Sequence, residues 1–268
     1  MQWENIRANQ FGYWVEKSEG VCILPIGVVE KHGNHLPLGT DMFAGTAICK
    51  KAAEMETAVV FPYYFLGQIS EARHVKGTIA PSHRLMMDSL LEMCDEIHRN
   101  GFTKIIIASS HGGNSSFLPF FLQEFPRLNR EYSVFSCFAG GLTPEQRDAI
   151  CKAAGADDLG EHAGLSETSL MMHLHPELIC MEDQDPTEGE SLNRFKELED
   201  LNVYSGFWWY AQYPNHVAGD HTKATPELGK MLFDMQWGNL VKKIKAVKAD
   251  TLSLKLIEEY NTLGNNPV

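Results

Sequence analysis

Two carboxylates and two imidazoles stand close together in the segment Glu30-Lys-His32-Gly-Asn-His35-Leu-Pro-Leu-Gly-Thr-Asp41. Glu30 and His32 are two residues apart, so on an extended segment both side chains point to the same side. Carboxylate oxygen combined with imidazole nitrogen suits Zn²⁺ or Mn²⁺. The alternative is a polar surface loop in which Asp41 caps a helix, and this segment alone does not decide between the two interpretations.

Two further clusters favour the metal site. His111 stands in the turn Ser110-His-Gly-Gly-Asn114 directly after an apolar run, with Asn114 as a candidate helix cap, and His162 and Glu167 belong to Glu161-His-Ala-Gly-Leu-Ser-Glu167. Each has a structural alternative: a loop imidazole bonded to backbone for His111, a surface histidine for His162, and a helix-capping carboxylate for Glu167. Three such clusters in three loops are hard to explain by helix caps, so we predict a metal site.

The elements that must position these residues alternate along the chain. Short runs rich in β-branched or aromatic residues are typical of strands buried on both faces, and the intervening segments show apolar residues at helical spacing. This alternation predicts an α/β fold, a three-layer α-β-α sandwich around a mostly parallel sheet, in a single domain over residues 1–268. Loops that follow parallel strands meet at one edge of the sheet, and the three clusters fall in such loops. The predicted strands are 21–26, 58–61, 104–108 and 133–138, and the predicted helices are 41–55, 81–99, 114–128, 144–154, 166–175 and 225–247.

Composition excludes several classes of function. The 268 residues include 23 Lys and Arg against 35 Asp and Glu, a net charge of −12, so we expect no nucleic-acid partner. The apolar runs are shorter than the ~20 residues that a membrane-spanning helix needs, and no secretory signal is recognisable, so we expect no membrane association and a cytoplasmic location. The six cysteines are spaced singly and are interpreted as buried apolar residues. The acidic stretch 182–200 is predicted to be a solvated excursion containing a short helix.

In combination, the clusters resemble the creatininase (creatinine amidohydrolase) family over the chain from about Leu24 to Gly229. The resemblance implies an α-β-α sandwich with a two-metal hydrolytic centre of Zn²⁺ or Mn²⁺, or Fe, two ions per chain, often in a hexamer, so we expect a homo-oligomer. It rests on four motifs that occur in order: Glu30-x-His32-Gly-x-His35-Leu-Pro-x-x-Thr40-Asp41, His111-Gly-Gly-Asn114, Glu161-His162-Ala-Gly-x-x-Glu167-Thr-Ser169, and Gly219-Asp220 followed by Ala224-Thr225 and Gly229.

The resemblance also implies how the ligands divide between the two ions. Creatininase takes its fifth ligand, a glutamate, from the position that is Gly113 in this chain, and we assign Glu167 in its place. The remaining implied ligands are Glu30 and His111 for one ion, His32 for the other, and Asp41 as the bridge between them.

Two divalent ions in such a centre lower the pKa of a shared water, so that hydroxide can attack a carbonyl that one ion polarises. His162 matches the histidine proposed to handle protons in creatininase, and it can donate a proton to the leaving atom. We count Glu167 with His162 as catalytic. The backbone N–H groups of Gly112 and Gly113 are candidates for stabilising the oxyanion and contacting the substrate.

Two positions argue against creatinine as the substrate. The tryptophan that closes the creatininase pocket corresponds to Asp158 here, so an aromatic lid is not expected and Asp158 is a candidate substrate contact. Gly112 stands where creatininase has a substrate-contacting tyrosine. The aromatic run 207–213 is a candidate pocket lining, although such a run more often belongs to the core or to a subunit contact.

The loop 67–78 is cationic through Arg73, His74 and Lys76. These donors suit a polar or anionic, oxygen-rich substrate. In the alternative interpretation, Arg73 and Lys76 pair with the acidic excursion.

We therefore expect a dinuclear metal-dependent hydrolase that attacks the carbonyl of a small polar cyclic substrate, a cyclic amide or a related compound other than creatinine. One alternative is a hydrolase of a keto-cyclitol or keto-sugar that resembles 3-dehydro-scyllo-inosose hydrolase. The other is a structural protein that binds metal without turnover.

Overall fold

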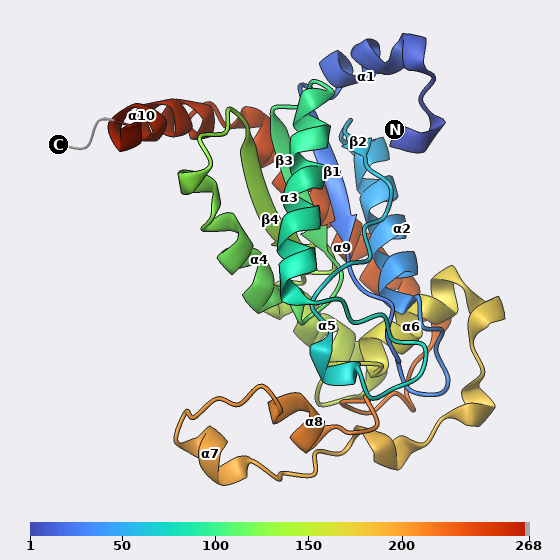
Figure 1. Ribbon diagram of the computed structural model, residues 1–268. Coiled ribbons are helices and arrows are strands. Elements are labelled where there is room, and N and C mark those ends of the chain that lie inside the picture. The colour runs from blue at the N-terminus through green and yellow to red at the C-terminus, as the bar shows by residue number, and fades with distance from the viewer. Residues whose placement is uncertain (266–268) are drawn as a thin grey trace.

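The computed structural model describes residues 1–265, apart from the side chain of Pro186. At its centre is a sheet of four parallel strands in the order β2-β1-β3-β4 (Figure 1). The strand expected at 58–61 is only two residues long, because Pro62 follows and proline cannot donate to the ladder. The strands are β1 (Val21–Ile26), β2 (Val59–Val60), β3 (Lys104–Ser109) and β4 (Ser133–Phe138).

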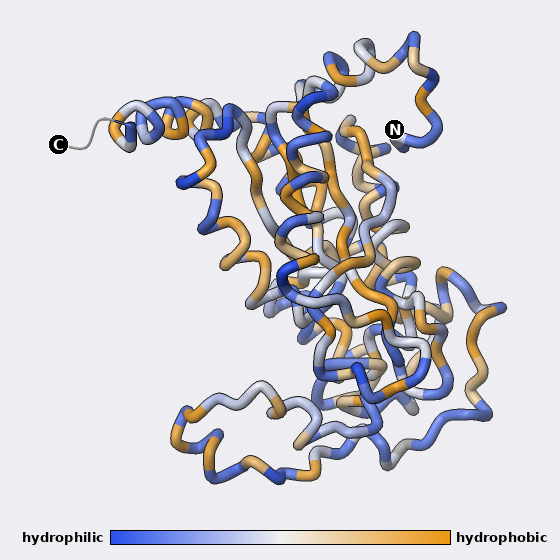
Figure 2. The backbone as a smooth tube through the Cα atoms, viewed as in Figure 1, coloured by the Kyte–Doolittle hydropathy of each residue, from blue (hydrophilic) through white to orange (hydrophobic). Residues whose placement is uncertain are grey.

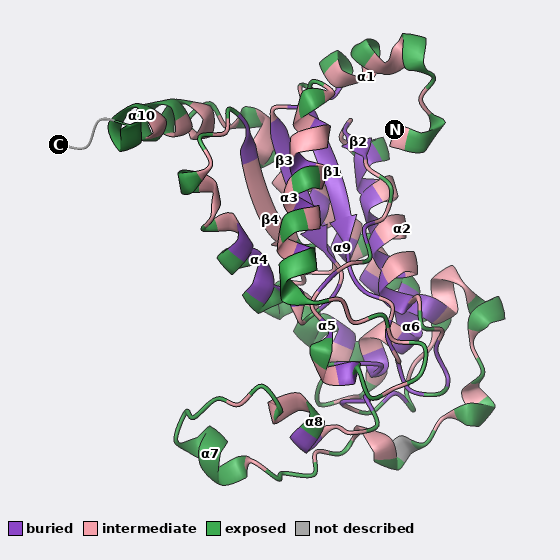
Figure 3. Ribbon diagram, in the orientation of Figure 1, coloured by how far each residue is buried: buried purple, intermediate pink, exposed green. Residues whose placement is uncertain are grey.

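Helices cover both faces of this sheet. Alternate residues of a strand point to opposite faces, and in β1 Cys22 and Leu24 pack against α3 and α4, whereas Val21 and Ile23 pack against α2 and α9. The predicted three-layer sandwich is therefore confirmed (Figure 3). The helices are α1 (Phe11–Lys17), α2 (Thr40–Met55), α3 (His83–Arg99), α4 (Asn114–Leu122), α5 (Pro144–Ala154), α6 (Leu165–Leu174), α7 (Lys196–Asp200), α8 (Trp208–Gln212), α9 (Pro226–Ala249) and α10 (Ser253–Asn265).

Some boundaries differ from the sequence-based expectation. The helix expected at 114–128 ends at Leu122 and is followed by a 3-10 turn at Phe125–Arg127. Pro126 has no N–H that could donate to the carbonyl of Leu122 four residues earlier, so the α-helical pattern cannot continue through it. Neither Asp41 nor Asn114 is a cap: Gly39 and Gly113 hold the N-cap positions of α2 and α4. The helices α1, α8 and α10 were not predicted.

The apolar residues concentrate along the strands and the helix faces turned to them (Figure 2). The stretch 182–200 is an exposed excursion that contains α7, as predicted. It leads through α8 back to the carboxyl edge of the sheet, the edge at which the three polar clusters lie. None of the described helices has the length and apolarity needed to cross a lipid bilayer.

Candidate metal centre

The loop from β1 to α2 and the end of β3 bring four of the predicted ligands together. Glu30 and His32 lie in that loop, Asp41 lies in the first turn of α2, and His111 follows β3; all four are buried. A glycine is required at position 27, because a Cβ there would lie 2.9 Å from the Cβ of Asp41. Gly27 therefore lets the start of α2 approach the end of β1.

The loop that precedes α6 supplies His162, and the first turn of α6 supplies Glu167. An antiparallel bridge between His162 and Ala218 fixes this loop. Ala163 adopts the left-handed region at φ 52°, and its N–H donates to Glu167 Oε2 at 2.6 Å. Glu167 therefore makes the backbone contact expected of a capping carboxylate and also faces the other predicted ligands. The interpretation of His162 as a surface histidine is wrong, because that residue is 8% exposed.

We refer to Glu30, His32, Asp41, His111, His162 and Glu167 together as the ligand cluster. Each of its three histidines has one ring nitrogen held by a backbone carbonyl. Because a carbonyl only accepts, that nitrogen carries the hydrogen, and the other ring nitrogen keeps its lone pair in the neutral ring. The free nitrogens are thus His32 Nε2, His111 Nδ1 and His162 Nδ1. The carbonyls that accept are those of Glu30 for His32 (3.3 Å), Gln68 for His111 (2.6 Å) and Lys31 for His162 (2.8 Å).

The free nitrogens of His32 and His111 point at carboxylates in two groups that share Asp41. His111 Nδ1 lies 2.8 Å from Glu30 Oε1 and 3.3 Å from Asp41 Oδ2. His32 Nε2 lies 3.4 Å from Asp41 Oδ1 and 3.7 Å from Glu167 Oε2. Both groups have the spacing of a candidate metal site.

The cluster contains buried polar atoms that lack a hydrogen-bond partner among the described residues: Glu30 Oε1, His32 Nε2 and Asp41 Oδ2. Buried polar atoms are normally paired, and lone pairs held this close repel one another unless a cation lies between them. Carboxylate oxygen with imidazole nitrogen is the donor set that Zn²⁺ and Mn²⁺ accept. The residues present therefore fit divalent metal ions.

The pKa shifts also indicate that positive charge stabilises the buried carboxylates. Burial alone would raise the pKa of Glu30, but His111 and His162 hold it well below its usual range. Burial alone would lower the pKa of His32, but the nearby carboxylates of Asp41 and Glu167 raise it to about 9. The pKa of His111 is raised by Glu30 and Asp41, likewise against burial. Without a metal ion, protons on the histidines balance the carboxylates.

Metal binding is therefore expected to depend strongly on pH. A metal ion must displace the protons that His32 and His111 carry below their raised pKa values, so Zn²⁺ affinity should rise between pH 6 and about 9, by about tenfold per pH unit for each proton released. Calorimetric titration in buffers of different ionisation enthalpy measures both the affinity and the protons released. An affinity that stays constant over this range would contradict the assignment of the two histidines.

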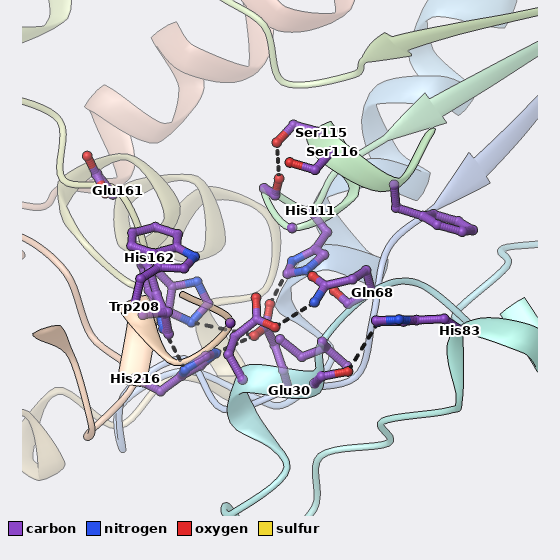
Figure 4. Close-up of a pocket in the computed structure, with 18 of the residues that line it drawn as sticks. Glu30, Gln68, His83, His111, Ser115, Ser116, Glu161, His162, Trp208 and His216 are labelled. Atoms are coloured by element: carbon purple, nitrogen blue, oxygen red, sulfur yellow. Dashed lines mark hydrogen bonds and ion pairs between the residues drawn. The ribbon is translucent and has the colours of Figure 1, made fainter. Parts of the chain in front are cut away.

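His216, which is 2% exposed, was not predicted as a site residue. Its Nε2 lies 2.5 Å from Glu30 Oε2, and its Nδ1 accepts from Trp209 Nε1 at 2.9 Å. Burial lowers the pKa of His216 to about 4, so the ring is neutral near pH 7. Figure 4 shows Glu30 between His111 and His216.

A cavity of about 750 Å³ opens onto the cluster. Gly112 and Gly113 line it, as expected for substrate-contacting residues, and so do Trp208 and Trp209 of α8. The cavity thus has an aromatic wall, supplied by the run 207–213 and not by position 158. Among the described residues, no lysine or arginine lines it. Its other apolar lining side chains are Ile69, Met87, Phe117, Phe120, Phe138 and Tyr204.

The other predicted substrate-binding residues lie outside the cavity lining. Arg73 and His74 are exposed, and the His74 ring contacts the backbone oxygen of Pro214 at 2.9 Å. Asp158 is also exposed and accepts from the N–H of Gly160 at 2.7 Å. The cationic loop therefore does not present its charges to the cluster.

The chain is similar in sequence to known proteins. A family model, Creatininase, described as creatinine amidohydrolase, matches residues 3–244. The creatinine amidohydrolase of Pseudomonas putida is 27% identical over 180 residues, which make up 63% of this chain and 69% of that protein. A mycofactocin precursor peptide peptidase of Mycobacterium ulcerans is 26% identical over 231 residues, 83% of each chain.

Solved creatininases have the same fold. One described as the Mn form aligns with a TM-score of 0.76 at 20% identity, covering 93% of this chain and 99% of that one. A mutant described as Zn-Zn type also aligns with a TM-score of 0.76, at 21% identity, covering 93% and 98%.

Proposed function

The chain belongs to the creatininase family of amidohydrolases, and we propose that it is a two-ion, divalent-metal hydrolase that cleaves the C–N bond of amides that carry an apolar group and no negative charge. The main support for the two-ion centre is that buried ligand atoms without hydrogen-bond partners lie in two groups that share Asp41. Zn²⁺ and Mn²⁺ are the ions that the donor set favours.

The proposed ligands are Glu30, Asp41 and His111 for one ion, and His32, Asp41 and Glu167 for the other. Ions bound there would lower the pKa of a water molecule and polarise the substrate carbonyl.

The chain itself supplies the remaining chemistry. His162 lines the cavity with its Nε2 held by the Lys31 carbonyl, so its Nδ1 is free to take up a proton and deliver it to the leaving nitrogen. Gly112 and Gly113 line the same cavity, and their backbone N–H groups are the candidate oxyanion contacts.

The proposed substrate class follows from the lining of the cavity. Its volume lies within the range of pockets that hold drug-sized ligands, so a substrate larger than creatinine fits. The wall offers aromatic and aliphatic contact area, and Glu71 and Glu161 are the charged side chains beyond the ligand cluster. Acidic side chains without a basic partner disfavour a carboxylate-bearing substrate. We therefore propose an amide with an apolar group and no negative charge, in place of the anionic substrate that the loop 67–78 suggested.

Metal analysis and a substrate screen test this proposal. Purified protein is analysed for metal and then assayed, before and after chelation, on a matched series of arylalkyl amides whose ring carries hydrogen, an ammonium group or a carboxylate. Creatinine and a keto-cyclitol serve as comparators. We expect about two ions per chain, turnover that is lost on chelation and restored by Zn²⁺ or Mn²⁺, and preference for the first two amides.

Each part of the proposal would be contradicted by a different experimental result. Turnover that survives complete metal removal would contradict the metal-dependent mechanism. Faster turnover of the carboxylate, of creatinine or of the keto-cyclitol would contradict the substrate class. Bound metal without turnover of any amide would favour a metal-binding structural protein.

A further inference from the structure

Glu30 is held from two sides. One carboxylate oxygen, Oε1, faces His111 Nδ1 at 2.8 Å and belongs to the ligand cluster. The other, Oε2, lies 2.5 Å from the Nε2 of His216, which comes from a loop 186 positions away in the sequence. We propose that His216, with its tautomer set by Trp209, is the positioning residue that fixes Glu30 for metal binding. This inference rests on the metal centre of the proposed function.

Trp209 determines what His216 can do chemically. The indole Nε1 is a donor only, and it points at His216 Nδ1 at 2.9 Å, so Nδ1 must accept and the neutral ring carries its hydrogen on Nε2. With a hydrogen on Nε2, His216 donates to Glu30 and has no lone pair there for a metal ion. Trp209 thus makes His216 a partner of a ligand and excludes it from being one.

Glu30 and Asp41 are the carboxylates of the group that includes His111, and position 113 adds none. A Cβ on Gly113 would lie 2.5 Å from His111 Nε2 and 2.8 Å from the Gln68 carbonyl oxygen, so this backbone leaves no room for a side chain at that position. Hydrogen bonds to the far oxygen of a ligating carboxylate orient it, and His216 provides such a bond to Glu30.

The loop that carries His216 is built to hold it in place. His216 adopts the left-handed region at φ 59°, which is uncommon for residues other than glycine. Two residues later, Ala218 pairs with His162 in an antiparallel bridge, and the rings of His162 and His216 lie 4.5 Å apart. The aromatic wall of the cavity is thereby connected to a metal ligand through the sequence of contacts Trp209, His216, Glu30.

The test compares Trp209→Phe with Trp208→Phe, using the full chain and Zn²⁺ alone as the probe. Both residues line the cavity, and the same indole is replaced in each, but Trp209 is the one whose N–H bonds to His216. Binding is measured by competition with a chromophoric chelator, and thermal unfolding of the metal-free proteins reports on the fold. We expect Trp209→Phe to lower the affinity for one of the two Zn²⁺ ions by about 10- to 100-fold and to leave the affinity for the other unchanged. Trp208→Phe should change neither.

A second variant, His216→Gln, checks the partner directly. It should lower the affinity for the same Zn²⁺ ion, because an amide is a poorer and less rigid substitute for the imidazole. The inference is overturned if Trp209→Phe and Trp208→Phe bind both ions as the unmodified chain does, or if the metal-free variants lose stability in proportion to their loss of affinity. An unmodified chain that binds no Zn²⁺ would contradict the proposed function instead, so the two failures are distinguishable.

Discussion

Replacing Asp41 with asparagine is expected to abolish both metal binding and hydrolysis. Asp41 is 2% exposed, and its two oxygens face the free nitrogens of His32 and His111, one on each side. Asparagine keeps the shape but removes the charge and replaces one acceptor with an N–H₂ group, so both groups lose a ligand. The metal contribution to such reactions is several kcal/mol, which corresponds to a loss of at least about a thousandfold in kcat/KM.

Metal content by elemental analysis and kcat/KM on the preferred amide measure this loss. The matched control is Asp88→Asn on α3, whose side chain is 72% exposed and which should bind metal and turn over as the unmodified chain does. His32→Gln separates the two groups: because Glu30, Asp41 and His111 form a candidate group without His32, one ion should remain. An Asp41→Asn protein that keeps both ions would show that the two groups do not share this residue.

Local signals in the sequence were enough to predict which of these side chains the structure brings together. The segments around Glu30, His111 and His162 each place chemistry-bearing residues within a few positions of one another, after a strand or before a helix, and parallel strands bring such loops to one edge. The alternation of the strands likewise predicted the two helical layers, because a strand buried on both faces must be covered on both.

Contacts between distant loops could not be predicted in this way. His216 has no carboxylate beside it in the sequence, and its partner Glu30 lies 186 positions away, so periodicity carries no information about the pair. The loop 67–78 shows the same limit. Its Ile69 and Ala72 are buried against Val28, and packing these apolar side chains inward leaves Arg73 exposed. Charge composition alone does not tell which way such a loop turns.

Replacing His162 with alanine is expected to lower kcat by about 10²- to 10⁴-fold, the usual contribution of a positioned acid or base, while both ions remain bound. His162 lines the cavity and is buried, and its Nδ1 lies 3.9 Å from Glu167 Oε2. Its Nε2 is held by the Lys31 carbonyl. Only the free Nδ1 can exchange a proton with a bound substrate, so loss of the ring should affect the chemical step more than substrate binding, and KM should change little.

Added imidazole distinguishes a proton-transfer role from a structural one. In His162→Ala the missing ring leaves space beside the cavity, and free imidazole that enters it should restore part of kcat, whereas it should have no effect on His173→Ala, a histidine of α6 outside the cavity lining. His162 also lies near Glu30 and His32 in a third candidate ligand group. If His162→Ala loses an ion, and imidazole restores activity only together with added metal, then His162 is a ligand. His162 lines the cavity, and retained metal with imidazole rescue is the result expected if it exchanges a proton with a bound substrate.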